Sequence, residues 1–395
     1  MSWGVRMQYK TIGEICTVVS GTTPKSDKAE YWGGNLIWIT PAELKEGNAV
    51  IYDSVRHITK AAVKASALKP FPKGTVILSS RAPIGKVAIA GTQMYCNQGF
   101  KNLICSEVIY NGYLYYYLKA KTAYLNSLGR GATFREISKQ IVEKIKIPVP
   151  SMQEQHRIAD ILFKIDALMG KRQQQAEKLD ELVKARFVEM FGDPVRNCLH
   201  TAARPMTEIC QIIDGDRGKN YPKADDFFDK GDCLFLNAKN VTKAGFNFDE
   251  CMFITKDKDN VLRKGKLQRG DIILTTRGTI GNLAFYTDDV PYSDIRINSG
   301  MVILRMNREY INPIYFIEQF KMQLENIKRK IASGTAQPQL PISTMNKIKV
   351  IIPDIRLQAN FANFVHEVDR EKERIQRSAA LLETLKRSLM QQYFG

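Results

Sequence analysis

Lys73–Ala90 reads KGTVILSSRAPIGKVAIA, and Arg269–Tyr286, which begins 196 residues further on, reads RGDIILTTRGTIGNLAFY. The two stretches align without a gap, and seven of their 18 positions are identical. Each stretch opens with β-branched and apolar residues, which favour a strand, and continues into a turn that contains glycine. The identical positions are Gly74/Gly270, Ile77/Ile273, Leu78/Leu274, Arg81/Arg277, Ile84/Ile280, Gly85/Gly281 and Ala88/Ala284. The chain therefore contains a duplicated unit.

Further matches in the same order extend this duplication along the chain. They are Glu14-Ile15-Cys16 with Glu208-Ile209-Cys210, Asn97-Gln98-Gly99 with Asn298-Ser299-Gly300, Ile145–Gln155 with Ile348–Gln358, and Phe191-Gly192 with Phe394-Gly395. The sequence thus predicts two tandem units, 1–193 and about 200–395, in an α+β fold with an approximate two-fold repeat. We expect a first mixed domain at 1–150, a first long helix at 151–193, a second mixed domain at 194–353 and a second long helix at 354–395. Within the mixed domains, Gly112–Tyr124 and Pro313–Ile331 look helical, and Thr75–Ser80 and Asp271–Thr276 look like strands.

The two long helices carry apolar residues at alternating spacings of four and three, which is typical of helices that pair along a seam. The seam positions are Ile158, Leu162, Ile165, Leu179, Val183, Val365, Val368, Ile375, Leu382 and Leu389. Arg172 and Arg186 interrupt the first series, and Lys372 and Lys386 interrupt the second. If an approximate two-fold relates the repeats, the helices run antiparallel, with a domain at either end. Two separate amphipathic helices are the alternative interpretation.

The positive charge of the chain is concentrated in the two mixed domains. The whole chain has a formal net charge of +17. Residues 1–150 carry 20 Lys/Arg against 9 Asp/Glu, and residues 201–353 carry 23 against 18, whereas the helical segments are nearly neutral. Such a distribution favours a polyanion as partner, because phosphate contacts release counterions. No apolar run approaches the ~20 residues of a membrane span, and the seven cysteines show neither C-x-x-C pairs nor a closed disulfide framework. We expect a cytoplasmic protein.

Motifs of catalysis are missing from the sequence. The nearest match to a methyltransferase Asn/Asp-Pro-Pro-aromatic segment is Asn312-Pro313-Ile314-Tyr315, which lacks the second proline and, like Asn111, is better interpreted as a helix N-cap. Gly85-Lys86 fails the P-loop pattern, and the four histidines are scattered. No Cys/His group has zinc spacing. We therefore expect no catalytic residue and no metal site in this chain.

Several residues are instead candidates for contact with nucleic acid. Arg81 and Arg277 precede their turns, where they either bind phosphate or pin the turn. The tyrosines at 113 and 115–117 have helical spacing and are more consistent with a core than with base stacking. Lys25 follows a polar loop that corresponds to Asp214–Lys219 in the second unit. Loops that differ between similar units are suited to reading two different base sequences.

The duplicated motifs together resemble the specificity subunits of type I restriction–modification systems, over nearly the whole chain. They are Ser20–Pro24 (SGTTP), Ile37–Thr40 (IWIT), Ser79–Gly85 (SSRAPIG), Asn97–Phe100 (NQGF), Ile147–Ala159 with its I-P-V-P and E-Q-x-R-I-A elements, and the closing Phe-Gly. The second unit departs from the pattern at Asp214–Gly218 and Asn298–Gly300.

The resemblance implies two target-recognition domains that read a bipartite, asymmetric site in double-stranded DNA. It implies helices that space the domains and bind two methyltransferase (modification) subunits, and a complex that restriction (translocase–nuclease) subunits join. S-adenosylmethionine, ATP and Mg²⁺ would then belong to the partners, and this chain would bind no cofactor. The expected DNA-contacting residues are Thr22, Thr23, Lys25, Arg81, Lys86, Asn97, Gln98, Arg130, Arg135, Arg217, Lys219, Arg277, Arg296 and Gln337.

Two rival functions remain open at this point. One is a fused methyltransferase or nuclease, which a cofactor-binding assay on the isolated chain would reveal. The other is a coiled-coil scaffold without a role on DNA, against which the concentration of charge in the mixed domains argues.

Overall fold

The computed structural model describes residues 8–45, 47–81, 83–131, 135–332 and 339–395. The chain forms two compact units. Unit 1 consists of Met1–Gln175 and Ile375–Gly395, and unit 2 of Ala176–Arg374. Each unit therefore contains a mixed domain together with part of each long helix, α6 (Met152–Phe191) and α11 (Ile355–Phe394).

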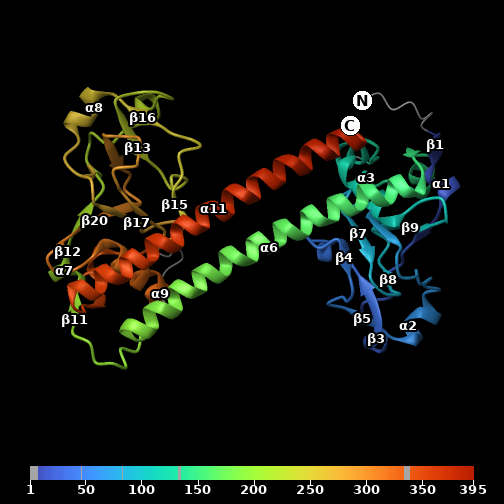
Figure 1. Cartoon of the computed structure of the whole chain (residues 1–395), viewed down its shortest axis with the longest axis horizontal. Coiled ribbons are helices and arrows are strands. Elements are labelled where there is room, and N and C mark those ends of the chain that lie inside the picture. Colours follow the sequence, from blue (N-terminus) through green and yellow to red (C-terminus); the bar gives the residue numbers. More distant parts are fainter. Residues whose placement is uncertain (1–7, 46, 82, 132–134, 333–338) are drawn as a thin grey trace. The chain divides into compact units, whose positions relative to one another are not determined.

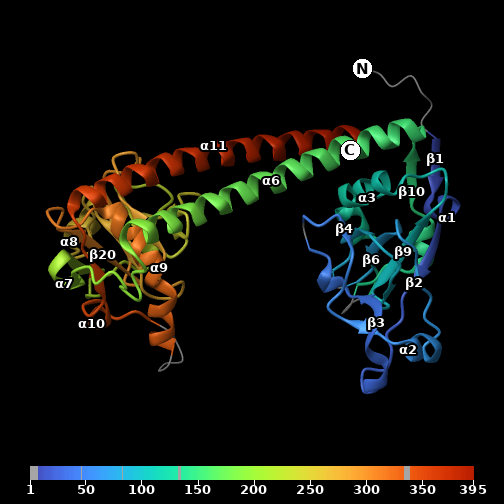
Figure 2. The same cartoon turned by 60° about the horizontal axis from the view of Figure 1, so that its bottom comes forward.

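Unit 1 is built on a five-stranded sheet of order β2-β9-β6-β7-β4 and a three-stranded sheet of order β5-β3-β8. Figure 2 shows β6 and β9 of the larger sheet near α3. A third pair, β1 with β10, joins the start of the unit to the residues before α6. The strands are β1 (Gln8–Thr11), β2 (Cys16–Ser20), β3 (Trp32–Ile39), β4 (Val50–Ile51), β5 (His57–Ile58), β6 (Val76–Ser79), β7 (Val87–Ala90), β8 (Tyr95–Cys96), β9 (Phe100–Cys105) and β10 (Lys146–Val149). The helices are α1 (Ile12–Ile15), α2 (Lys60–Ala65), α3 (Asn111–Ala120), α4 (Thr122–Ser127) and α5 (Lys139–Glu143), with 3-10 turns at Ala29–Tyr31 and Pro41–Glu43.

Unit 2 repeats most of this order of elements, but β14 and β15 form a hairpin of their own, and the single helix α9 follows β20 where α3 and α4 follow β9 in unit 1. Its four-stranded sheet has the order β12-β20-β17-β18, and its three-stranded sheet the order β16-β13-β19. Figure 1 labels β12, β20 and β17 of the first sheet and β16 and β13 of the second. The strands are β11 (Ala203–Pro205), β12 (Cys210–Asp214), β13 (Cys233–Leu236), β14 (Val241–Thr242), β15 (Gly245–Phe246), β16 (Phe253–Ile254), β17 (Ile272–Thr275), β18 (Leu283–Phe285), β19 (Ile295–Ile297), β20 (Met301–Met306) and β21 (Lys349–Ile351). The helices are α7 (Met206–Ile209), α8 (Lys256–Val261), α9 (Pro313–Ala332) and α10 (Ile342–Met345), with a 3-10 turn at Ala224–Asp226. The predicted α+β repeat is confirmed.

The central strands are buried on both faces, which explains their unbroken apolar sequence. In β6, Val76 and Leu78 pack toward α3 and the long helices, whereas Ile77 packs on the opposite face against β8 and β9 residues. In β17, Ile272 and Leu274 face the helical side in the same way. A strand alternates its side chains between two faces, so two layers of core require apolar residues at every position.

The long helices close the core of each unit on one side. In unit 1, Ile158 and Leu162 of α6 and Phe394 of α11 belong to the same core as α3. In unit 2, Phe187 of α6 and Phe361 of α11 pack with their ring centroids 5.4 Å apart. Seven of the ten seam residues are buried, and Leu179, Leu382 and Leu389 are half-buried.

Contacts within each unit show that the two helices run antiparallel. In unit 1, Arg157 lies over the ring of Tyr393, and Asp166 pairs with Lys386. A residue further along α6 thus contacts a residue that comes earlier in α11. In unit 2, Asp180 pairs with Lys372. The predicted antiparallel pairing therefore holds.

One buried glutamine fastens the start of each long helix to its unit. Gln155 accepts a hydrogen bond from the backbone N–H of Tyr110 at 2.8 Å and donates to the carbonyls of Val108 and Pro150 at 3.0 and 2.9 Å. Gln358, its partner in the repeat, makes the same three bonds, to the N–H of Asn312 and to the carbonyls of Tyr310 and Pro353. A long polar side chain is tolerated in these cores because both ends of its amide are satisfied.

Two predictions on the helices that follow the sheets can now be assessed. The tyrosine run belongs to the core, as expected, since Tyr113 and Tyr116 are almost fully buried. Asn312 caps α9, with its side chain accepting from the N–H of Ile314 at 2.9 Å. The cap prediction is wrong for Asn111, which is the first residue of α3 and donates to the carbonyl of Gly74 at 2.9 Å instead.

Candidate nucleic-acid interface

In unit 1, most of the candidate DNA-contacting residues lie on loops at one edge of the five-stranded sheet. Strands β2 and β6 end at this edge, and β7 and β9 begin there, because Ser20 pairs with Lys101, Leu78 with Val87 and Ser79 with Phe100. We call these loops the unit 1 loop cluster: Thr22–Lys25, Ser80–Arg81, Pro83–Lys86 and Asn97–Gly99, together with Arg130 and Glu136.

Hydrogen bonds hold the unit 1 loop cluster together. The N–H of Thr22 donates to the carbonyl of Cys96 at 3.0 Å, and the hydroxyl of Thr23 donates to the side-chain oxygen of Gln98. The N–H of Ser80 donates to the carbonyl of Gly99 at 2.7 Å. Loops far apart in the sequence thus form one surface, whose backbone positions are fixed while several side chains remain exposed.

A glycine makes this close approach possible in both units. A Cβ atom on Gly21 would lie 2.1 Å from the carbonyl oxygen of Asn97, and a Cβ on Gly215 would lie 2.3 Å from that of Asn298. No side chain fits at either position, since Cβ atoms do not approach backbone oxygen so closely. Gly21 and Gly215 therefore mark equivalent points, from which Thr23 corresponds to Arg217 and Lys25 to Lys219.

An ionic cluster backs the loops of unit 1. Lys101 is buried, and its ammonium group donates to Glu136 at 3.1 Å and to the hydroxyl of Ser80 at 3.2 Å. Arg81 reaches the same carboxylate at 3.8 Å, and its backbone bridges to Glu136. In this unit the repeated arginine pins its turn, which is one of the two roles that the sequence left open.

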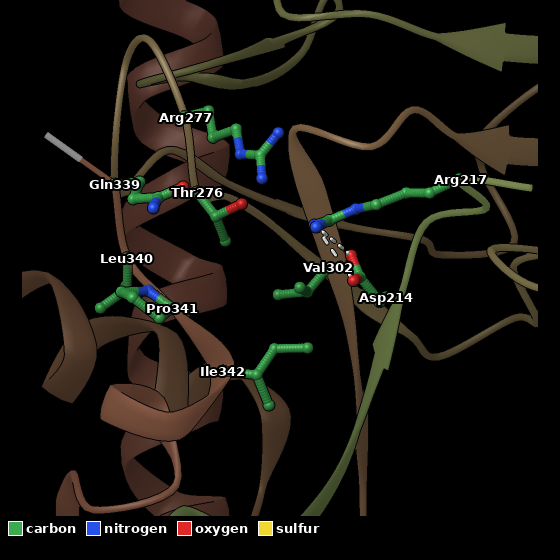
Figure 3. A pocket seen from close by; sticks show the side chains of 9 residues that line it. All are labelled: Asp214, Arg217, Thr276, Arg277, Val302, Gln339, Leu340, Pro341 and Ile342. Atoms are coloured by element: carbon green, nitrogen blue, oxygen red, sulfur yellow. Dashed lines mark hydrogen bonds and ion pairs between the residues drawn. The ribbon is translucent and has the colours of Figure 1, made fainter. Parts of the chain in front are cut away.

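Unit 2 has a pocket at the corresponding place. Val302 holds the position of Lys101, because it pairs with Asp214 as Lys101 pairs with Ser20. Gln339 holds the position of Glu136, since it bridges to Arg277 as Glu136 bridges to Arg81. The space left by these smaller or neutral side chains is a pocket of about 270 Å³ (Figure 3). It is lined by Asp214, Arg217, Thr276, Arg277, Val302, Gln339, Leu340, Pro341 and Ile342.

The pocket is lined by both polar and apolar side chains. Figure 3 shows Arg277 and Arg217 with their guanidinium groups toward the opening between them, and Val302, Leu340 and Ile342 among the other lining side chains. Nη2 of Arg217 lies 3.1 Å from both carboxylate oxygens of Asp214 and 3.4 Å from the carbonyl oxygen of Ser299. The side chain of Arg277 has no hydrogen-bond or ion-pair partner among the described residues. Within the described part of the chain, the repeated arginine is therefore paired through its side chain in unit 1 and unpaired in unit 2.

A buried carboxylate fixes the loop that carries Arg217. Asp216 is buried and accepts the N–H of Gly218 at 2.8 Å and that of Arg263 at 2.7 Å. The bond from Gly218 lowers the pKa of Asp216 most; burial raises it, and the bond from Arg263 lowers it further, so that the net shift is downward. Arg263 and Lys219 are exposed on the same pair of loops. The loop thus presents basic side chains from a backbone held by a buried anion.

Arg296 is a correction to the predicted contacts. It is buried, and its guanidinium donates to the carboxylate of Asp259 and to the carbonyls of Lys264, Asp259 and Leu262. A guanidinium has five N–H donors, so these four bonds leave little for DNA. Arg296 stabilises unit 2 from within.

The other predicted contacts fall into three groups. Thr22, Thr23, Lys25, Gln98, Arg130, Arg135, Arg217, Lys219 and Arg277 are exposed, and Arg81, Lys86 and Asn97 are half-buried. Asn97 holds its own turn by accepting the N–H of Gly99 at 2.9 Å. Gln337 lies outside the described residues. Sequence reasoning missed Lys101, Glu136, Asp216 and Gln339 as parts of the site, because nothing in their local sequence shows that they meet the loops.

Comparison with known proteins identifies the family of this chain. The family model of the type I restriction modification DNA specificity domain matches the chain twice, at residues 4–178 and 202–383. The chain belongs to this family. The type I restriction enzyme MjaIX specificity subunit of Methanocaldococcus jannaschii is 31% identical over 98% of this chain and 91% of its own length. The EcoR124I/EcoR124II specificity subunit of Escherichia coli is also 31% identical, over 41% of each chain.

The fold of the specificity subunits is likewise shared. The crystal structure of a type I restriction–modification S subunit from M. genitalium superposes with a TM-score of 0.61 at 16% identity, covering 100% of this chain and 98% of that one. The resemblance inferred from the duplicated motifs is confirmed, and the chain is a DNA specificity subunit, the non-catalytic recognition component of a type I system. The fused-enzyme and scaffold alternatives are not favoured.

Two further findings concern the described residues only. None of their helices combines the length and hydropathy that a membrane span requires. No three of their His, Cys, Asp or Glu side chains come together as a metal site would demand.

Proposed function

We propose that each mixed domain of this specificity subunit reads one part of a bipartite, asymmetric sequence in double-stranded DNA. The proposal rests on loops that have equivalent backbone positions in the two units but carry different side chains. Gly21 and Gly215 meet equivalent carbonyls, yet the frame presents Thr23 in unit 1 and Arg217 in unit 2. Because base pairs are distinguished by the hydrogen-bonding groups offered to them, unlike side chains on one frame read unlike half-sites.

The charge distribution supports binding to the DNA backbone in both domains. The excess of basic residues lies in segments 1–150 and 201–353, and several of the exposed ones sit on the loops that also carry the candidate base contacts. Contacts with phosphate fix the orientation of a protein on the duplex, while side chains near the base edges determine sequence preference. A surface that combines the two kinds of residue suits specific recognition.

We propose that two modification subunits and the restriction subunits bind this chain in the cytoplasm, and that S-adenosylmethionine, ATP and Mg²⁺ are bound by those partners. The relatives are named as specificity subunits of type I restriction enzymes, which supports partners of this kind. The long helices, which are largely polar outside their seam, offer extended surfaces for them.

Exchange of one domain tests the proposal. Residues 1–150 are replaced by the corresponding segment of a related specificity subunit, and the methylated bases are sequenced in cells that carry the complete system. We expect one half of the methylated sequence to change and the other half to stay the same. The reciprocal exchange of 194–353 is the matched control and should change only the other half. A change in both halves after either exchange would contradict the proposal that each domain reads one half of the sequence.

A further inference from the structure

The pocket of unit 2 places an arginine in a setting that the equivalent part of unit 1 lacks. Where unit 1 has the neutral pair Thr23 and Gln98, whose side chains bond to each other, unit 2 has Arg217 bonded to Asp214 and to the carbonyl of Ser299. The strand position of Asp214 is occupied by Ser20 in unit 1. The arginine and the carboxylate that orients it are therefore both particular to unit 2.

The orientation of Arg217 leaves donors for a ligand. All its described bonds use Nη2, and the 3.4 Å contact with Ser299 is long enough to be exchanged for a better acceptor. Nη1 and Nε have no hydrogen-bond partner among the described residues, and the side chain is 49% exposed. A planar guanidinium held from one side in this way presents its remaining N–H groups in a fixed direction.

We propose that Arg217, held by Asp214, reads a guanine of the second half-site, and that Arg277 contacts a neighbouring phosphate; this rests on the proposed function. Arginine donates to O6 and N7 of guanine in the major groove, the commonest specific contact to a base. Asp214 beside Arg217 repels an anionic phosphate more strongly than a base edge without net charge. Arg277 has no carboxylate partner among the described residues, so its charge remains available to a phosphate.

The wall of the pocket supports this division of roles. In unit 1 the equivalent space is occupied by the buried Lys101 and by Glu136, which also neutralises Arg81. In unit 2 the apolar side chains of Val302 and Leu340 line the pocket without competing for the two guanidinium groups (Figure 3). Among the described residues, Arg277 thus lacks the carboxylate that Glu136 supplies to Arg81 in unit 1, while Arg217 is held by Asp214 alone among carboxylates.

Three substitutions in the full chain, each tested in cells with the complete system, separate the roles. Arg217→Lys keeps the charge and loses the planar fork, and Asp214→Asn keeps the size and loses the orienting charge. For both we expect one guanine position in the second half of the methylated sequence to become degenerate, with discrimination falling about 5- to 150-fold. Arg277→Ala should weaken binding equally for all sequences, and the first half of the site should stay unchanged in all three variants.

Binding of the purified complex to DNA over a series of salt concentrations provides the second measurement. Arg217→Lys should leave the slope of log K against log salt unchanged, whereas Arg277→Ala should reduce it by about one. If Arg217→Lys or Asp214→Asn leaves every position of the methylated sequence as selective as before, the base-reading role is overturned. Equal weakening on all sequences would also overturn it, since that result marks a phosphate contact. If the parent system methylates no two-part sequence at all, the proposed function itself fails.

Discussion

Lys372 of α11 donates to the carboxylate of Asp180 of α6 at 2.6 Å, inside unit 2. Lys386 makes the corresponding pair with Asp166 inside unit 1. In the apolar series of the second helix these lysines stand where the first helix has Met169 and Val183. The two lysine interruptions of the seam are therefore matched by carboxylates on the facing helix, as expected of polar groups that fix register in paired helices. The arginine interruptions bond within α6 instead, Arg172 to Gln175 and Arg186 to Glu189.

Replacement of Lys386 should destabilise the protein more than replacement of Lys372. The Lys386–Asp166 side chains are only 19% and 24% exposed, and Asp166 also accepts the hydroxyl of Tyr116, whereas Asp180 is 63% exposed. We expect Lys386→Met to cost about 1–2 kcal/mol of unfolding free energy and Lys372→Met less than about 1 kcal/mol. Urea unfolding followed by circular dichroism measures both. Asp166→Asn combined with Lys386→Met should recover part of the loss, and equal costs for the two single variants would refute the argument.

The buried glutamine at the start of each long helix should be intolerant of apolar substitution. Gln155→Leu removes three hydrogen bonds and leaves the N–H of Tyr110 and two carbonyls without their partners. We expect a loss of about 2–4 kcal/mol, because unsatisfied buried polar groups cost more than a hydrogen bond contributes. Gln358→Leu should cause a similar loss in unit 2. The exposed Gln153→Leu, two residues before Gln155, is the control and should change the unfolding midpoint little.

Asp259 should make the stability of unit 2 depend on pH. Burial raises the pKa of this carboxyl, but hydrogen bonds from Lys266 and Arg296 and the charge of both outweigh that effect and bring its pKa below the ordinary value. A lowered folded-state pKa contributes stability that is present above the unfolded pKa and is lost as pH falls through the folded one. We therefore expect unit 2 to lose stability below about pH 4.

The substitution Asp259→Asn tests this account at neutral pH. It leaves the buried guanidinium of Arg296 without its anion, which should cost about 3–5 kcal/mol. The variant should also show a weaker fall in stability below about pH 4 than the parent chain. Thermal unfolding between pH 3 and pH 7, followed by a probe in unit 2, measures both effects. If the stability of the variant falls below about pH 4 as steeply as that of the parent chain, carboxylates other than Asp259 cause the loss of stability.

Lys25 should contribute more to DNA affinity than Arg81. Lys25 is exposed and has no ion-pair partner among the described residues, whereas Arg81 shares Glu136 with Lys101. We expect Lys25→Ala to reduce the salt slope of binding by about 0.9, the value for one phosphate contact, and Arg81→Ala to reduce it less. Fluorescence anisotropy of the assembled complex at several salt concentrations gives the slopes. Lys164→Ala, on α6 and outside the loop cluster, is the charge-matched control; if it gives the same reduction, the assignment of Lys25 is wrong.

The repeat, the mixed class of the fold and the paired helices could all be predicted from the sequence. A strand buried on both faces leaves a short unbroken apolar run, a helix leaves a period near 3.6, and a duplication leaves the same pattern twice, so these features are local and can be counted. The run of β-branched and apolar residues that opens Val76–Ser79 and the spacing from Ile158 to Val183 are cases in which the pattern alone was sufficient.

The roles of charged residues were decided by the tertiary structure. Arg296 and Arg277 look alike in the sequence, yet Arg296 is buried against Asp259, 37 residues away, whereas Arg277 lines a pocket and its side chain has no partner among the described residues. The pocket is lined by Val302 at the strand position where unit 1 has Lys101, which meets Glu136 from 35 residues away. Whether a charge is paired or available depends on which distant segment packs beside it. A local sequence pattern does not show which distant segment packs beside a charged residue, so the pairing of that residue is seen only in the folded structure.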